Sequence, residues 1–197
     1  MKEATDEEVF QRYVEDLRLS PEDFNKKILD VGAGAAQFAK WAKEHGVSRE
    51  IYSLEPKKEY LAEKDKSVVA RAETMPFIDE TFDLVVSNSA IPNVYKDEGN
   101  ADVMKEKVIN NLREMMRVIK PGGEIRLARV LMGKEDKSQQ ILSQSIEKTL
   151  ENLETEGNVR IERIRTPSDD TYEYDENNNP VKLLAEAFLI IIRKQKK

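Results

Sequence analysis

The sequence predicts an α/β protein of three layers, in which a mostly parallel sheet of seven strands carries helices on both faces and only the last strand runs antiparallel. Short apolar segments alternate with amphipathic segments of helical period along most of the 197 residues. This alternation is typical of a parallel sheet covered on both sides. The last two apolar segments, 159–165 and 187–193, are joined without a helix, so we expect them to pair antiparallel at one edge. The chain shows neither an internal repeat nor a second domain, which predicts a single domain.

The first three elements are a helix, a strand and a second helix. Thr5 followed by Glu8 has the form of a capping box, and apolar residues then recur at helical spacing up to residue 17. Residues 27–31 form the first strand. Residues 37–45 form the second helix, whose apolar side chains are expected in the core.

The remaining elements follow the same alternation. The segment 101–120 has helical period and is expected to stop at Pro121, where Pro-Gly-Gly opens a further strand. The stretch 166–182 is polar and turn-rich, so we expect a hairpin connection there. The other expected strands are 50–56, 68–71, 81–89 and 124–131, and the other expected helices are 57–64 and 141–153.

Composition excludes several classes of function. Charged residues make up 36% of the chain, but the signs are interspersed and the net charge is −6, so strong nucleic-acid binding is not expected. The chain has no cysteine and one histidine, His45, which excludes disulfides, thiolate nucleophiles and a His/Cys metal centre. No apolar run approaches the roughly 18–20 residues that span a membrane. We therefore expect a cytoplasmic protein without a membrane segment.

The stretch "LDVGAGAAQFA" (29–39) takes a strand into a helix through small residues. Such a turn brings backbone N–H groups close to a ligand at the helix N-terminus, although it also serves plain packing. Gly32 and Gly34 fit the dinucleotide pattern G-x-G-x-x-G, but the third position is Gln37. That substitution, and the lack of an evident hydride-transfer constellation, disfavour a nicotinamide-dependent dehydrogenase.

Four blocks in order resemble the class I S-adenosylmethionine (SAM)-dependent methyltransferases, in particular the small "type 11" domains. They are "LDVGAGAAQFA", the "EP" at Glu55-Pro56, "RAETMPFIDETFDLVVSNSAIPNV" (71–94) and "LREMMRVIKPGGEI" (112–125). The resemblance covers about residues 27–193. It implies a Rossmann-like fold, with residues 1–25 as an N-terminal cap helix and residues 26–197 as the catalytic core. It also implies SAM as the cofactor and S-adenosylhomocysteine (SAH) as its product.

The resemblance also implies the residues that hold the cofactor. A carboxylate in the first strand contacts the ammonium end, the glycine loop approaches the methionyl part, and the carboxylate after the second strand accepts both ribose hydroxyls. The residues after the fourth strand lie near the amino acid part. The expected cofactor-binding residues are Asp30, Gly32, Ala33, Gly34, Glu55, Pro56, Ala72, Glu73, Asn88 and Ser89.

Two positions depart from the family pattern. Ala36 stands where the family has its third loop glycine, which narrows the loop slightly. Arg71 stands where the family often has Asp or Ser, and a guanidinium cannot accept a hydrogen bond from the adenine amino group. We therefore expect the backbone of Ala72 and Glu73 to hold the adenine.

The methyl transfer that the resemblance implies needs few catalytic groups from the protein. The sulfonium already activates the methyl group, so transfer is an in-line displacement that needs alignment and removal of water. No catalytic residue is assigned, because His45 lies at the far end of its helix and Asn93 and Tyr95 fit ordinary loop roles. Tyr13 is expected to pack in the core.

The acceptor and the methylated atom are not readable from the sequence. Net acidity and small size favour a small-molecule acceptor and a monomer or weak dimer. The alternative is a non-catalytic SAM-binding protein or a scaffold that works with a partner. Ala36 and Arg71 allow this alternative, whereas the intact loop and Glu55 argue against it.

Overall fold

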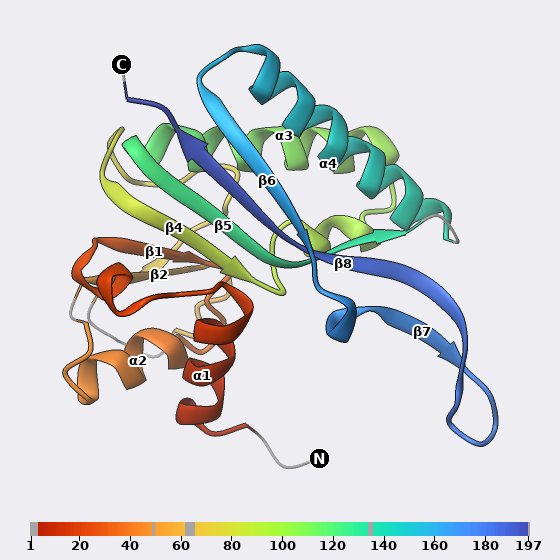
Figure 1. The fold of residues 1–197 in the computed structure, drawn as a ribbon. Coiled ribbons are helices and arrows are strands. Elements are labelled where there is room, and N and C mark those ends of the chain that lie inside the picture. The colour runs from red at the N-terminus through yellow and green to blue at the C-terminus, as the bar shows by residue number, and fades with distance from the viewer. Residues whose placement is uncertain (1–3, 49, 62–65, 134–135, 197) are drawn as a thin grey trace.

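One mixed sheet forms the centre of the protein (Figure 1). The computed structural model describes residues 4–48, 50–61, 66–133 and 136–196. The strands are β1 (Ile28–Val31), β2 (Ile51–Glu55), β3 (Ser67–Val69), β4 (Phe82–Asn88), β5 (Ile119–Gly133), β6 (Val159–Arg165), β7 (Thr171–Tyr174) and β8 (Pro180–Lys194). Their order is β3-β2-β1-β4-β5-β8-β6, and β7 also pairs with β8. The first five strands pair in parallel and β8 is antiparallel to β5, β6 and β7, which confirms the predicted fold class.

Helices cover both faces of the sheet, which gives three layers (Figure 1). Along β8, Leu189 and Ile191 enter the core under one helix pair, and Ile190 and Ile192 enter the core under the other. This alternation follows from the period of two of a strand. The first pair is α1 (Asp6–Asp16) with α2 (Gln37–Glu44), and the second is α3 (Ala101–Val118) with α4 (Lys137–Thr155). Short 3-10 helices span Pro21–Asn25, Asn93–Asp97 and Pro167–Asp169.

The N-terminal helix α1 is docked firmly on α2. The predicted capping box is present, because the N–H of Glu8 donates to Thr5 Oγ1 at 3.2 Å and the N–H of Thr5 donates to Glu8 Oε2 at 2.7 Å. The ring of Phe10 stacks on that of Trp41, with 4.1 Å between the ring centroids. Gln37 at the start of α2 donates to the carbonyl of residue 4 at 3.3 Å. The helix therefore has a fixed position over this face of the sheet.

The helix expected over 57–64 is not formed in its described part. Residues 57–61 make a turn in which the N–H of Tyr60 donates to the carbonyl of Lys57 at 3.1 Å, and residues 62–65 lie outside the described residues. Only Leu61 is buried among residues 56–61. A short segment with one buried side chain has no apolar face that packing could stabilise as a helix.

The prediction that Pro-Gly-Gly separates α3 from the fifth strand was wrong. Helix α3 ends at Val118, and β5 begins at Ile119, before the Pro-Gly-Gly at 121–123. Ile119 already pairs with Phe82, and the register then shifts before Leu84 pairs with Glu124. The Pro-Gly-Gly is thus an irregularity within the β4–β5 pairing, since proline and glycine are tolerated at bulges.

The connection 166–182 contains an eighth strand that the prediction missed. Residues 171–174 form β7, which pairs with the first residues of a β8 longer than expected. Together they form an arm beyond the end of β6 (Figure 1). The signal was present in Thr-Tyr-Glu-Tyr, whose β-branched and aromatic residues favour strands.

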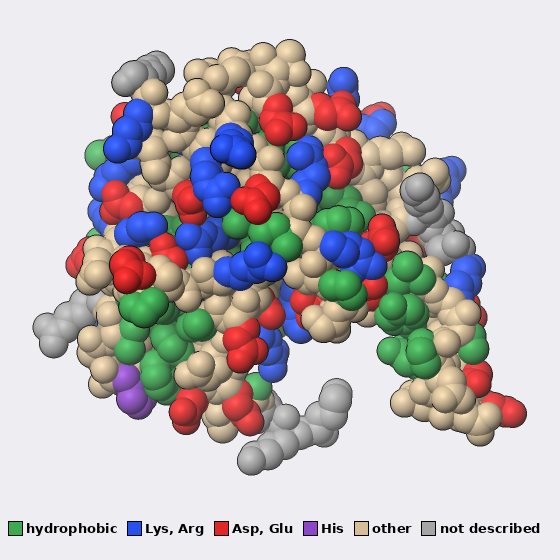
Figure 2. All heavy atoms as spheres, in the orientation of Figure 1, with side chains coloured by type: hydrophobic (Ala, Val, Ile, Leu, Met, Phe, Trp, Pro, Cys, Tyr) green, Lys and Arg blue, Asp and Glu red, His purple; other side chains and the backbone are tan. Residues whose placement is uncertain are grey.

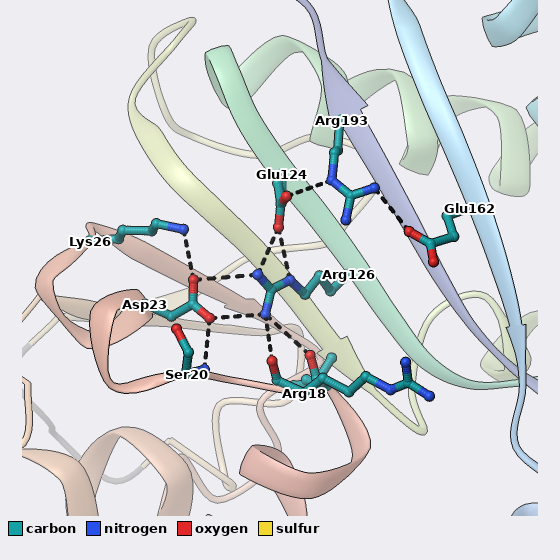
Figure 3. Close-up of polar contacts among 9 residues, drawn as sticks. Arg18, Ser20, Asp23, Lys26, Glu124, Arg126, Glu162 and Arg193 are labelled. Carbon is teal, nitrogen blue, oxygen red and sulfur yellow. Dashed lines mark hydrogen bonds and ion pairs between the residues drawn. The ribbon is translucent and has the colours of Figure 1, made fainter.

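An ion-pair network joins the segment after α1 to the start of β5 (Figure 3). The guanidinium of Arg126 contacts both oxygens of Asp23, at 3.0 and 3.3 Å, and Glu124 Oε2 at 2.7 Å. Glu124 also accepts from Arg193 at 2.7 Å, and Arg193 reaches Glu162 at 3.0 Å. Because Asp23 is almost fully buried, this network holds the chain segment that leads from α1 into β1.

Candidate functional site

The loop after β1 has three residues in the left-handed backbone region. They are Gly32 (φ +77°), Gly34 (φ +50°) and Ala36 (φ +53°). A Cβ on Gly32 would lie 2.5 Å from the Cβ of Ala90, whereas a Cβ on Gly34 would meet nothing within 4 Å. Gly32 is therefore required by packing, and Gly34 faces open space that a ligand can enter. Ala36 holds a conformation that glycine adopts with less strain.

The backbone N–H groups of this loop are used within the protein. Those of Gly32 and Ala33 donate to the carbonyl of Leu54, at 2.8 and 3.1 Å, because the β1–β2 pairing continues past the end of β1. The N–H of Gly34 donates to Glu55 Oε2 at 3.1 Å. All three N–H groups therefore have acceptors within the protein, and the approach of this loop to the methionyl part stays a prediction. The loop leaves open space beside Gly34, and the Gly34 N–H anchors the Glu55 carboxylate at the edge of the loop.

Asp30 in β1 is the most strongly perturbed acid of the site. Its side chain has no exposed surface; Tyr13 of α1 donates to Oδ1 at 3.4 Å, and Oδ2 has no hydrogen-bond partner among the described residues. Burial raises the pKa of Asp30 to about 8, with the Tyr13 hydrogen bond opposing and the nearby Glu55 adding to the rise. An orphaned carboxylate oxygen needs a donor, and an ammonium group fits that need.

Glu55 lies at the carboxyl end of β2, beside the loop. It is 8% exposed; Oε2 accepts from Gly34, and Oε1 accepts from the N–H of Lys57 at 3.2 Å. These backbone bonds fix the orientation of the carboxylate, and each oxygen keeps a second lone pair for an additional donor. Pro56 follows on the exposed side. Asp30 and Glu55, 25 residues apart in the sequence, are thus brought together at one edge of the sheet, as the motif implied.

The turn after β3 is held by α3. Ala72 is buried and Glu73 is half-buried in this turn. Glu114 Oε2 accepts from the backbone N–H of residue 75 at 2.7 Å, and Arg117 donates to the carbonyls of residues 75 and 77 at 3.0 and 2.7 Å. Glu114 and Arg117 were not among the expected site residues, although both lie in the fourth block. The available signal was that Glu114 and Arg117 are three residues apart on one helix, a spacing that lets opposite charges pair.

The carboxyl end of β4 is held by α1. Asn88 donates through Nδ2 to Asp16 Oδ2 at 2.9 Å, and Ser89 Oγ donates to Asn88 Oδ1 at 3.1 Å. Asp16 also pairs with Nε of Arg129 at 3.3 Å, and Arg129 reaches Asp169 at 2.5 Å. Asp16 and Arg129 were not among the expected site residues, because their contacts join residues 40 to 113 positions apart.

The remaining candidates have structural contacts. Tyr13 stacks on Phe38 in the core, as expected. Its hydroxyl also donates a hydrogen bond to Asp30, a second role that packing alone does not describe. Asn93 donates to the carbonyl of Arg129 at 2.7 Å and bridges the β5 backbone. Tyr95 is buried, and burial together with Glu73 raises its pKa well above the usual range. His45 caps the end of α2 and stacks on Trp41.

Within the described part of the chain, no three His, Cys, Asp or Glu side chains gather as a metal site. The described helices include none with the length and apolar character needed to cross a bilayer. Asp30, Glu55 and Asn88 all lie at the carboxyl ends of their strands, β1, β2 and β4. Open α/β sheets bind ligands at this end of their strands.

Comparison with known proteins agrees with this geometry. A family model described as "Methyltransferase domain" matches residues 29–127, half of the chain. No curated protein matches the sequence significantly.

Among solved structures, YcgJ from Bacillus subtilis has 16% identity and a TM-score of 0.60, with 93% of this chain and 99% of that chain covered. The plantazolicin methyltransferase BpumL, complexed with SAH and a substrate analogue, has 9% identity and a TM-score of 0.60, with 95% and 86% covered. The methyltransferase in a Haloferax volcanii complex with the Trm112 methyltransferase activator has 14% identity and a TM-score of 0.59, with 98% and 94% covered. At these identities the likeness is one of fold.

Proposed function

The chain belongs to the SAM-dependent methyltransferase domain family, and on that basis we propose that it transfers the methyl group of SAM to a small-molecule acceptor. The observation that carries the proposal is the pairing of Asp30 and Glu55 beside Gly34. One buried carboxylate has an orphaned oxygen, the other has both oxygens oriented by backbone N–H groups, and the Cα of Gly34 faces open space.

When bound, SAM supplies a methyl group already activated by its sulfonium. The residues of this chain bind and orient it. Asp30 accepts a hydrogen bond from the ammonium group, and Glu55 accepts the ribose hydroxyls while its backbone donors keep it in place. The turn at Ala72 and Glu73, held by α3, borders the adenine.

The cap role of residues 1–25 is part of the same proposal. Tyr13 closes Asp30 from solvent, and Asp16 holds Asn88, so α1 reaches the site at two points. A helix in that place excludes water from the methionyl end, which an in-line displacement requires. These site residues all come from one chain, so a monomer or weak dimer suffices.

A small-molecule acceptor is supported by the charge of the chain. A net charge of −6 with interspersed signs opposes docking on a nucleic-acid backbone. The cytoplasm, where SAM is made, is the compartment that we propose.

The test is a thermal-shift comparison of SAM, SAH and NAD at millimolar concentration. Selective binding stabilises the native state by about 2.7 kcal/mol at a hundredfold excess over Kd. SAM and SAH should raise the melting temperature and NAD should not. Equal shifts, or no shift, with all three ligands would contradict the proposal.

A further inference from the structure

A polar groove lies beside the proposed cofactor site and is not used by it. It has a volume of about 730 Å³ and is formed by one face of α1, the backbone bend of β5 and the turn before β7. Figure 2 shows the surface hollowed between the lobe of α1 and α2 and the β7–β8 arm. Its lining residues are Thr5, Glu7, Glu8, Gln11, Arg12, Glu15, Asp16, Arg129, Ser168 and Asp169.

One side chain separates this groove from the end of β4. Asp16 lines the groove, and its Oδ2 accepts from Asn88, the residue placed near the methionyl part of the cofactor. None of the described residues forms a hydrogen bond to its other oxygen, Oδ1. Asp16 is therefore held in place through one oxygen and offers the other to whatever enters the groove.

The backbone is strained where the groove meets the site. Ser89 and Arg129 both have left-handed φ angles, +58° and +56°, although neither is glycine. They are neighbours, because the N–H of Ser89 donates to the carbonyl of Ala128 at 3.2 Å. At Arg129 the β5–β8 register also shifts, which turns the guanidinium toward Asp16 and Asp169. Strain of this kind is kept where it positions functional side chains.

The charge of the groove selects the kind of molecule that it can hold. Five carboxylates face two guanidinium groups, and Arg129 is already shared between Asp16 and Asp169. Burial raises the pKa of Asp16, while the Asn88 hydrogen bond and the Arg129 charge oppose the rise. An anionic acceptor would be repelled, and a protonated amine would be attracted.

We infer that this groove is the acceptor site, that the acceptor is an amine, and that Asp16 Oδ1 accepts a hydrogen bond from its nitrogen. The inference rests on the proposed function. The amine gives up a proton to water in the open groove, and its lone pair then forms the new N–C bond as the C–S bond of the cofactor breaks. The electron pair of that bond stays on sulfur, giving SAH and a methylammonium product. The carboxylate of Asp16 stabilises the positive charge that develops on nitrogen.

The test uses sinefungin, a SAM analogue with an amine-bearing carbon in place of the methylsulfonium, so that a positive nitrogen stands where the methyl group is transferred. Calorimetric Kd values for sinefungin and SAH are compared in the wild type, Asp16→Asn and Glu44→Gln, the last removing one negative charge from α2 outside the groove. We expect Asp16→Asn to weaken sinefungin at least about tenfold more than SAH. We expect Glu44→Gln to change both ligands equally.

An equal loss for sinefungin and SAH in Asp16→Asn would overturn the inference, because it would show that Asp16 acts only through Asn88. If Asp16→Asn does not fold, Asp169→Asn removes the second carboxylate on Arg129 and should reduce the preference for sinefungin in the same direction. SAH that fails to bind the wild type would instead refute the proposed function. With labelled SAM, label entering primary amines supports the inference, and label entering only alcohols or carboxylic acids of the same carbon skeletons overturns the amine class.

Discussion

The binding of SAM should depend steeply on pH because of Asp30. In the free protein this carboxyl is fully buried and has a pKa of about 8, so it is protonated at neutral pH. Binding an ammonium group beside Oδ2 requires the ionised form. The cofactor must therefore displace a proton when it binds, and its affinity should rise with pH.

The magnitude follows from the pKa. Each pH unit below about 8 adds about 1.4 kcal/mol to the free energy of ionising Asp30, which is about tenfold in affinity. Between about pH 6 and about pH 7.5 the Kd for SAM should fall roughly thirtyfold, with one proton released per molecule bound. Above that range the curve should flatten as Asp30 ionises on its own and the amino group of SAM begins to titrate. Tyr13, whose pKa is raised well above its usual range by burial, stays protonated throughout.

The assay is isothermal titration calorimetry in buffers of different ionisation enthalpy, which reports the Kd and the number of protons released. Asp30→Asn is the matched control, because it keeps the shape and the Tyr13 contact but cannot ionise. It should bind SAM more weakly, with an affinity that no longer changes over this pH range. A wild-type Kd that stays constant between about pH 6 and about pH 7.5, or the same slope in Asp30→Asn, would refute the reasoning.

The same pKa has a consequence for the free protein. Because the folded-state pKa lies above the ordinary value of 3.8, the folded state retains the proton that the unfolded chain releases. The stability from this group is complete below that ordinary value and is lost as pH rises through about 8. Asp30→Asn should therefore make the protein more stable than the wild type at alkaline pH.

Three further predictions concern the site and its support. Glu55→Ala should cost about 2–4 kcal/mol of SAM affinity, measured by calorimetry, with a fold unchanged by circular dichroism; an unchanged Kd would mean that another group binds the ribose. Gly34→Val should abolish SAM binding, since its side chain fills the open space, whereas Ala36→Gly should bind normally and unfold at a slightly higher denaturant concentration; a folded Gly34→Val variant with normal affinity would place the ligand elsewhere. Arg126→Ala should lower the free energy of unfolding by about 1–3 kcal/mol, because the buried Asp23 loses two hydrogen bonds and keeps only Lys26 and the N–H of Ser20; a loss below about 0.5 kcal/mol in urea unfolding would show that the network contributes little.

The fold class was predicted from local signals that the tertiary structure then confirmed. The Thr5–Glu8 capping box and the helical period of α1, α3 and α4 are properties of neighbouring residues, so they can be read before folding. The antiparallel last strand followed from the missing helix between β6 and β8. The boundary at Pro121 was wrong because pairing of Ile119 with Phe82 overrides the turn signal of Pro-Gly-Gly.

The sequence by itself determined the family, the cofactor and the glycine loop, because the four blocks are contiguous patterns whose spacing is fixed by the strand–loop–helix unit. Only the tertiary structure decided how the site is enclosed. The contacts of Tyr13 with Asp30 and of Asp16 with Asn88 join α1 to strands that lie 17 and 72 residues further along the chain. The ionisation of Asp30 likewise depends on burial by residues from several elements. Such contacts depend on how whole elements pack in space, and no pattern of neighbouring residues encodes that packing.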